Sequence, residues 1–211
     1  MKKMFTFESL NPETVTTICK MNETNIDLFY AFMFIPVYRH PLGEQKKRGN
    51  KIIIPASMNI PGEVISMRYD GMCRGMKRTD DFSCFRHSII IDIGTHKNPL
   101  SIKLTNGKIS ITGPYSHLLT HDIVSAVNKN LQIAQSRFES FKDEVFEYYQ
   151  TGKLVLSKET NFLRDEYNDD EIKSFAEAMI DILLEDNPKI FTEDLVLLSS
   201  YTAMVNLNFD L

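Results

Sequence analysis

Basic side chains in the first half of the chain are the residues that could form a functional site, because they could bind phosphate. Residues 39–108 hold 13 Lys/Arg and six Asp/Glu, whereas residues 136–211 hold seven Lys/Arg and 17 Asp/Glu. Basic clusters attract phosphate through their charge. Two interpretations stay open: this half meets a nucleic acid, or the two halves neutralise each other within the fold. The basic positions considered for phosphate contact are Lys46, Lys47, Arg48, Arg74, Lys77, Arg78, Arg86 and Lys108.

Motifs of known enzyme classes are missing from the sequence. It has no G-x-S-x-G, no P-loop and no Gly-rich dinucleotide fingerprint. The acidic run Asp169, Asp170 and Glu171 stands where a helix favours negative charge in its first turn. We therefore expect neither catalysis nor a cofactor.

Histidine and cysteine spacing offers two metal-ligand patterns. His117 and His121 are four residues apart, and Cys84 and His87 are three apart, with Cys73 and His40 elsewhere in the chain. Neither pattern has an evident third ligand, so we interpret the histidines as helix-surface residues and predict no metal site. The odd number of cysteines, with no secretory leader, favours reduced thiols inside a cell.

Three short strands follow one another between residues 88 and 112. Alternation of isoleucine with polar residues is typical of a half-buried antiparallel sheet. Asn106-Gly107 separates the last two strands and favours a hairpin in which both residues have positive φ. One face of this sheet is expected to pack against helices; it holds Ile89, Ile91, Ile93, Ile109 and Ile111.

Other elements must cover or extend this sheet. A nearly wholly apolar helix is predicted between a cap at Asn25 and a stop at Pro36, and Asn168 is predicted to cap an acidic helix. Asp70-Gly71 predicts a second hairpin. The remaining predicted elements are strands at 14–21, 51–55, 63–69, 72–77 and 201–211, and helices at 116–149 and 169–185.

A family resemblance arises from several of these stretches. LSIKLTNGKISITGPYS, followed by an amphipathic helix, resembles the strand–hairpin–strand–helix end of a TATA-binding-protein repeat. TVTTICKMNETNIDLFYAFMFIPV resembles the first strand and helix of the TATA-binding-protein-like proteins of large nucleocytoplasmic DNA viruses. MRYDGMCRGM and FRHSIIIDI resemble their Gly-x-x-Arg-Gly hairpin and the next strand, with His87 where Asn is expected. The resemblance covers residues 14–135.

The resemblance implies a concave sheet face that binds the DNA minor groove and wedges phenylalanines between base steps. Arg86 and Leu104 stand where the wedges are expected, and Phe85, one place off, would point to the opposite face. Recognition of a TATA sequence is therefore not expected. The alternative for the polar positions is a solvated or partner-covered face. The residues that would line the DNA-binding face are Val15, Thr17, Ser88, Ile90, Ile102, Leu104, Lys108, Ser110 and Thr112.

The domain organisation follows from the same resemblance. We predict an α+β fold: a curved antiparallel sheet with helices on its convex face, forming half of a saddle, plus an acidic helical extension. Residues 1–135 would be one repeat, 136–198 the acidic helical segment and 199–211 a final strand. Three interpretations of that strand stay open: the start of a second repeat in a longer protein, part of a half-saddle that dimerises, or an extra edge strand.

The function expected from the sequence is a viral TATA-binding-protein-like, non-enzymatic DNA-binding or transcription-initiation factor. The alternative is a virion or assembly module that uses the same sheet face for another protein. Expected partners are DNA, transcription machinery or virion proteins, with a homodimer as a further option. The longest apolar run, at residues 26–37, contains Asp27, so no membrane segment is expected. The expected location is the viral factory in the host cytoplasm, the nucleus or the virion.

Overall fold

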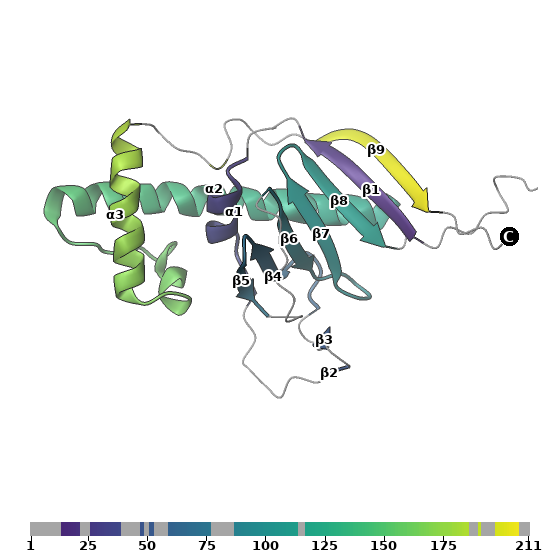
Figure 1. Ribbon diagram of the computed structural model, residues 1–211, viewed down its shortest axis with the longest axis horizontal. Helices are drawn as coiled ribbons and strands as arrows, with labels where there is room; N and C mark the ends of the chain where they lie inside the picture. Colours follow the sequence, from purple (N-terminus) through teal and green to yellow (C-terminus); the bar gives the residue numbers. More distant parts are fainter. Residues whose placement is uncertain are drawn as a thin grey trace, which may run out of the picture.

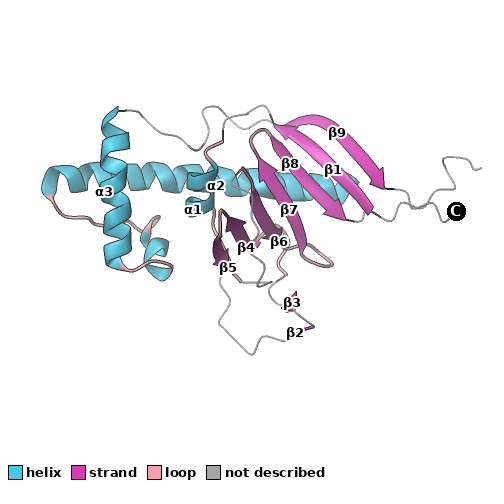
Figure 2. Cartoon of the chain, in the orientation of Figure 1, coloured by secondary structure: helices cyan, strands magenta, loops and turns pink. Residues whose placement is uncertain are grey.

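The protein adopts an α+β fold in which helices pack on one face of a curved antiparallel sheet (Figures 1 and 2). Its elements are β1 (Thr14–Met21), α1 (Leu28–Phe34), β2 (Lys47–Arg48), β3 (Lys51–Ile52), β4 (Val64–Tyr69), β5 (Met72–Gly75), β6 (Ile89–Ile93), β7 (Leu100–Thr105), β8 (Lys108–Gly113), α2 (His117–Thr151), η3 (Asn161–Asp165), α3 (Asp169–Glu185) and β9 (Leu197–Asn206). This computed structural model describes residues 14–21, 26–38, 47–48, 51–52, 59–76, 87–113, 117–185, 190 and 197–206, with β2, β3 and β9 described by their backbone alone. The predicted fold class is confirmed.

Seven strands form the main sheet, in the order β5-β4-β6-β7-β8-β1-β9. The β4–β5 hairpin turns at Asp70 and Gly71, whose φ angles are 42° and 81°. The β7–β8 hairpin turns at the predicted Asn106-Gly107, but only Gly107 has a positive φ, of 72°. The prediction of a positive φ at Asn106 is therefore wrong. β9 pairs with β1 at one edge, so the last strand extends the same sheet.

Two helices give the sheet its covering layer. Asp27 caps α1, because its carboxylate accepts a hydrogen bond from the Tyr30 amide at 3.0 Å. The cap predicted at Asn25 lies outside the described residues. α2 crosses behind the strands in Figure 1 and continues past the β5 edge toward α3. It is one unbroken helix of 35 residues, so the boundary predicted at 135/136 falls within it.

The core lies between the sheet and the helices, and strand register decides which residues enter it. Ile91 faces Ile102 across β6–β7, and Ile102 faces Ile111 across β7–β8. Directly opposed residues share one face of a sheet. Ile102 and Leu104 are thus as buried as the predicted isoleucine rows, and Thr17, opposite Ile111, is 4% exposed. The prediction that these three residues line the DNA-binding face is wrong.

Residues 136–185 form what we call the helical extension: the second part of α2, then η3 and α3. Phe141 of α2 stacks on Phe175 of α3, with ring centroids 5.4 Å apart. Asn168 caps α3 as predicted, since its side chain accepts from the Glu171 amide and Glu171 accepts from the Asn168 amide, both at 2.9 Å. None of the helices in the described ranges has the length and apolar character of a membrane span.

Candidate nucleic-acid interface

The sheet face opposite the core carries hydroxyl and basic side chains. Thr16 faces Thr112, and Lys20 faces Lys108, across the β1–β8 pair; Lys103 faces Ser110 across β7–β8. We call this surface the polar face. In the described part of the chain it consists of Thr16, Ile18 and Lys20 on β1, Lys108, Ser110 and Thr112 on β8, Ser101, Lys103 and Thr105 on β7, Ile90 and Asp92 on β6, and Ser66 and Arg68 on β4.

Two lysines stand directly opposite each other on this face. Lys20 and Lys108 are register partners and both side chains are exposed. Neither forms an ion pair with another residue that the structure describes. Like charges directly opposed across a strand pair destabilise a sheet. An anion placed between the two ammonium groups would relieve that repulsion.

Hydroxyl groups extend from the lysine pair along the same two strands. The hydroxyls of Thr16 and Thr112 lie 3.2 Å apart on the exposed surface. Ser110 stands between Lys108 and Thr112 on β8 and is half-buried. Hydroxyls of this kind donate hydrogen bonds to phosphate and sugar oxygens in nucleic-acid complexes.

The one acidic residue of the polar face is neutralised by its neighbours. Asp92 is 1% exposed and accepts hydrogen bonds from the hydroxyls of Ser66, at 2.7 Å, and Ser101. The guanidinium of Arg68 lies 3.9 Å from its carboxylate. The buried Nε of Arg68 and the hydroxyl of Ser88 have no hydrogen-bond partner among the residues that the structure describes. The exposed charge of this face is therefore positive.

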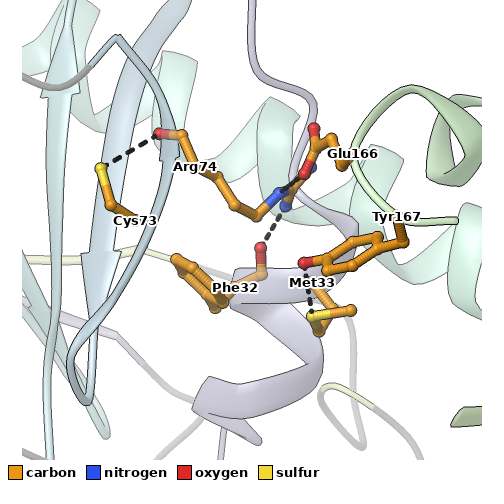
Figure 3. A network of polar contacts seen from close by, with 6 residues as sticks. All are labelled: Phe32, Met33, Cys73, Arg74, Glu166 and Tyr167. Atoms are coloured by element: carbon orange, nitrogen blue, oxygen red, sulfur yellow. Dashed lines mark hydrogen bonds and ion pairs between the residues drawn. The ribbon is translucent and has the colours of Figure 1, made fainter. Parts of the chain in front are cut away.

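Arg74, predicted to contact DNA, is instead a core residue. It is 4% exposed, and its Nε donates to Glu166 Oε2 at 2.5 Å while a second guanidinium nitrogen donates to Glu166 Oε1 at 3.1 Å. It also donates to the carbonyl of Phe32 (Figure 3). Arg74 faces Met67 across β4–β5, which places it on the core side. The predicted DNA contact at Arg74 is wrong because this side chain joins the sheet to the helical extension.

The surroundings of this ion pair shift the pKa of nearby groups. Arg137 on α2 lies 4.3 Å above the ring of Phe162, on which Arg74 also rests at 5.9 Å. Burial and the charge of Arg74 lower the pKa of Arg137, against the opposing effect of Glu166. Burial raises the pKa of Tyr167, whose hydroxyl donates to the sulfur of Met33 at 3.3 Å. These contacts belong to the core.

The other predicted site residues divide into three groups. Lys108, Ser110 and Thr112 lie on the polar face, with Ile90 half-buried beside them. Ser88 is 1% exposed, so it offers no free surface to DNA. Val15 pairs with Gly113 through its backbone. Lys46, Lys77, Arg78 and Arg86 lie outside the described residues, and of Lys47 and Arg48 only the backbone pairing in β2–β3 is described.

Several polar-face residues were missed by the sequence reasoning, above all Lys20 and Lys103. The Asn-Gly hairpin gives enough information to find one of them, since pairing Thr105 with Lys108 puts Lys103 opposite Ser110. Because side chains alternate between the two faces along β7, the same pairing also places Ile102 and Leu104 on the core side. Lys20 requires the β1–β8 pairing, which joins strands almost a hundred residues apart in sequence, and no local pattern contains it.

The metal-ligand patterns find no support in the described part of the chain. His121 is exposed, and no group of three or more His, Cys, Asp or Glu residues there could hold a metal ion. Cys84 and His40 lie outside the described residues. Comparison with known proteins finds no family model, no curated protein and no solved structure that matches this chain.

Proposed function

We propose that the protein is a non-enzymatic nucleic-acid-binding module that holds DNA on its polar face, as a TATA-binding-protein-like transcription factor of a DNA virus would. The observation that carries the proposal is the lysine pair: Lys20 and Lys108 face each other, exposed, with no described carboxylate between them. A DNA phosphate supplies the negative charge that this pair lacks. The adjacent hydroxyls of Thr16, Thr112 and Ser110 add hydrogen-bond donors for the backbone.

Affinity on this surface comes from charge and shape. Neutralising two phosphates gives a slope of about −2 in a plot of log K against log salt concentration. Sequence-independent binding of this type has a Kd of roughly 10⁻⁴ to 10⁻⁶ M at physiological salt. Leu104, which stands at a wedge position, is fully buried and has no access to base steps. Binding is therefore expected without a kink from this residue and without a preference for a TATA sequence.

Fluorescence anisotropy with a labelled AT-rich duplex, at low and at physiological salt, tests the proposal. The affinity of the unaltered chain for the duplex should fall steeply as the salt concentration rises. The double substitution Lys20→Glu and Lys108→Glu should weaken binding by tenfold or more at low salt. It should also reduce the slope of log K against log salt concentration by about two.

Lys129→Glu is the matched control, because Lys129 is an exposed lysine on α2, away from the polar face. It changes net charge per substitution by the same amount, so it should leave affinity within about twofold if the polar face is the site. Absence of binding at low salt would overturn the DNA proposal. A loss from Lys129→Glu as large as the loss per polar-face lysine would assign the binding to overall charge instead.

The competing function is a protein–protein module that uses the polar face for another chain of a virion or assembly. The net charge of −4 and the burial of Leu104 favour it. The same anisotropy experiment separates the two functions, since a protein-binding face predicts no salt-dependent duplex binding.

A further inference from the structure

Exposed apolar side chains gather on the helical extension. Six large hydrophobic residues are exposed in the described part of the chain, and five of them lie beyond residue 145. These five are Phe146 (53% exposed), Tyr149 (55%), Val155 (53%), Ile182 (43%) and Leu184 (56%), and the sixth is Met72 on β5 (38%). Single exposed apolar residues are ordinary on a protein surface, but a local concentration of them marks an interaction site.

Phe146 and Tyr149 are the two aromatic residues among these five. They are three residues apart on α2, so their side chains are neighbours on the helix surface. The core face of the same turns is already occupied by Phe141 and Val145, both fully buried. The exposed aromatic pair therefore contributes little to the core, and aromatic residues of this kind are enriched in protein interfaces.

A carboxylate borders the aromatic pair. Asp143 and Glu147 are exposed and form no ion pair with the residues that the structure describes. Asp143 stands three residues before Phe146 and shares its helix surface, whereas Glu147 lies about 100° farther around the helix. The whole helical extension holds 13 Asp/Glu and six Lys/Arg. A surface with this charge repels nucleic acid and attracts cationic groups.

We propose that the acidic aromatic patch, made of Asp143, Phe146 and Tyr149, docks a lysine- or arginine-rich segment of a partner protein that also carries apolar side chains. Cationic groups of the partner meet the Asp143 carboxylate within the negative field of the helical extension, and its apolar side chains cover the two rings. A second copy of the chain fits less well, because hydroxyl groups outnumber apolar side chains on its described positive surface, the polar face. This patch lies near the C-terminal end of α2, the helix that continues past the β5 edge toward α3 in Figure 1, whereas the polar face lies on the sheet.

The full chain can be tested with defined synthetic peptides. The probe is an amphipathic peptide with leucines on one face and lysines on the other, compared with one peptide that has glutamates for the lysines and one that has serines for the leucines. The chain has no tryptophan, so Tyr149→Trp supplies a single tryptophan, within the patch, whose emission can be excited selectively over that of the tyrosines. Its emission should shift to the blue on adding the leucine–lysine peptide and stay unchanged with the other two.

Substitutions then locate the binding. Phe146→Ala should weaken binding of the labelled leucine–lysine peptide about tenfold, as expected for a central interface aromatic. Val155→Ala, which removes an equally exposed apolar side chain, should change affinity less than about twofold, and Met72→Trp should give no peptide-dependent shift. Circular dichroism confirms that these surface variants stay folded.

Three outcomes would overturn the proposal. The first is no binding of the leucine–lysine peptide, or equal binding of the glutamate peptide. The second is binding that Phe146→Ala leaves unchanged, because charge alone would then account for it. The third is self-association in sedimentation velocity that Phe146→Ala abolishes, which would make a second copy the occupant.

Discussion

Arg74 illustrates how one buried residue connects two parts of the molecule. Its guanidinium, 3% exposed, pairs with the Glu166 carboxylate, 14% exposed, and rests on the rings of Phe32 and Phe162. Removing one partner of such a pair leaves an uncompensated buried charge. Glu166→Ala should therefore lower the free energy of unfolding by about 3–5 kcal/mol, measured by urea denaturation.

The double substitution Arg74→Met and Glu166→Leu should recover much of that loss, since it removes both charges together. Arg164→Ala is the comparison, because its ion pair with Asp169 is exposed. It should cost less than about 1 kcal/mol. Equal effects of Glu166→Ala and Arg164→Ala would contradict a structural role for the buried pair.

Tyr167 predicts how stability depends on alkaline pH. Burial raises its pKa, so the folded state favours the neutral phenol more than the unfolded state does. The stabilisation is complete below the ordinary tyrosine pKa of about 10 and is lost as pH rises through the raised pKa. The Tyr167→Phe chain should lose less stability than the unaltered chain between about pH 9 and pH 11 in urea titrations. Tyr149→Phe, at an exposed position, should leave this pH dependence unchanged.

At the scale of elements, one carboxylate holds the segment after α2 against that helix. Thr160 is fully buried and donates its hydroxyl to Glu144 at 2.7 Å, and the Ser157 amide donates to the same carboxylate at 2.7 Å. Thr160→Val keeps the shape but removes the donor, and should cost about 1–3 kcal/mol in thermal or urea unfolding. Thr151→Val, at an exposed threonine of α2, should be close to neutral. If Thr151→Val cost more stability than Thr160→Val, the Glu144 carboxylate would not be what holds this segment against α2.

The elements themselves were largely predictable from local patterns. The isoleucine alternation of β6 and β8, the two hairpin turns and the Asn168 cap all depend on neighbouring residues, and each was located correctly. Arg74 was misplaced because a basic residue beside a glycine hairpin has the same local pattern whether it faces solvent or Glu166. Glu166 is 92 residues away in sequence, so the pairing follows only from the folded arrangement.

At the scale of the whole molecule, α2 makes the sheet and the helical extension one folding unit. Phe138, Phe141 and Val145 are fully buried, and Phe138 packs on Tyr30 and Phe34 of α1. A chain that ends at Gln135 lacks these core residues and should fail to fold, giving no cooperative unfolding transition in circular dichroism. Cooperative unfolding of that shortened chain would instead support 1–135 as a separate domain.

The continuity of α2 also fixes a distance. A helix of 35 residues is about 50 Å long, and α2 runs this length as one continuous α-helix. Two bodies bound at opposite ends of the molecule would be held at a set spacing and a set rotation about the helix axis. Inserting residues between Gln135 and Phe146 would change both: each added residue lengthens the rod by about 1.5 Å and turns its far end by about 100°. The number of residues in α2 therefore sets both the spacing and the relative rotation of the two ends, and selection can act on that number.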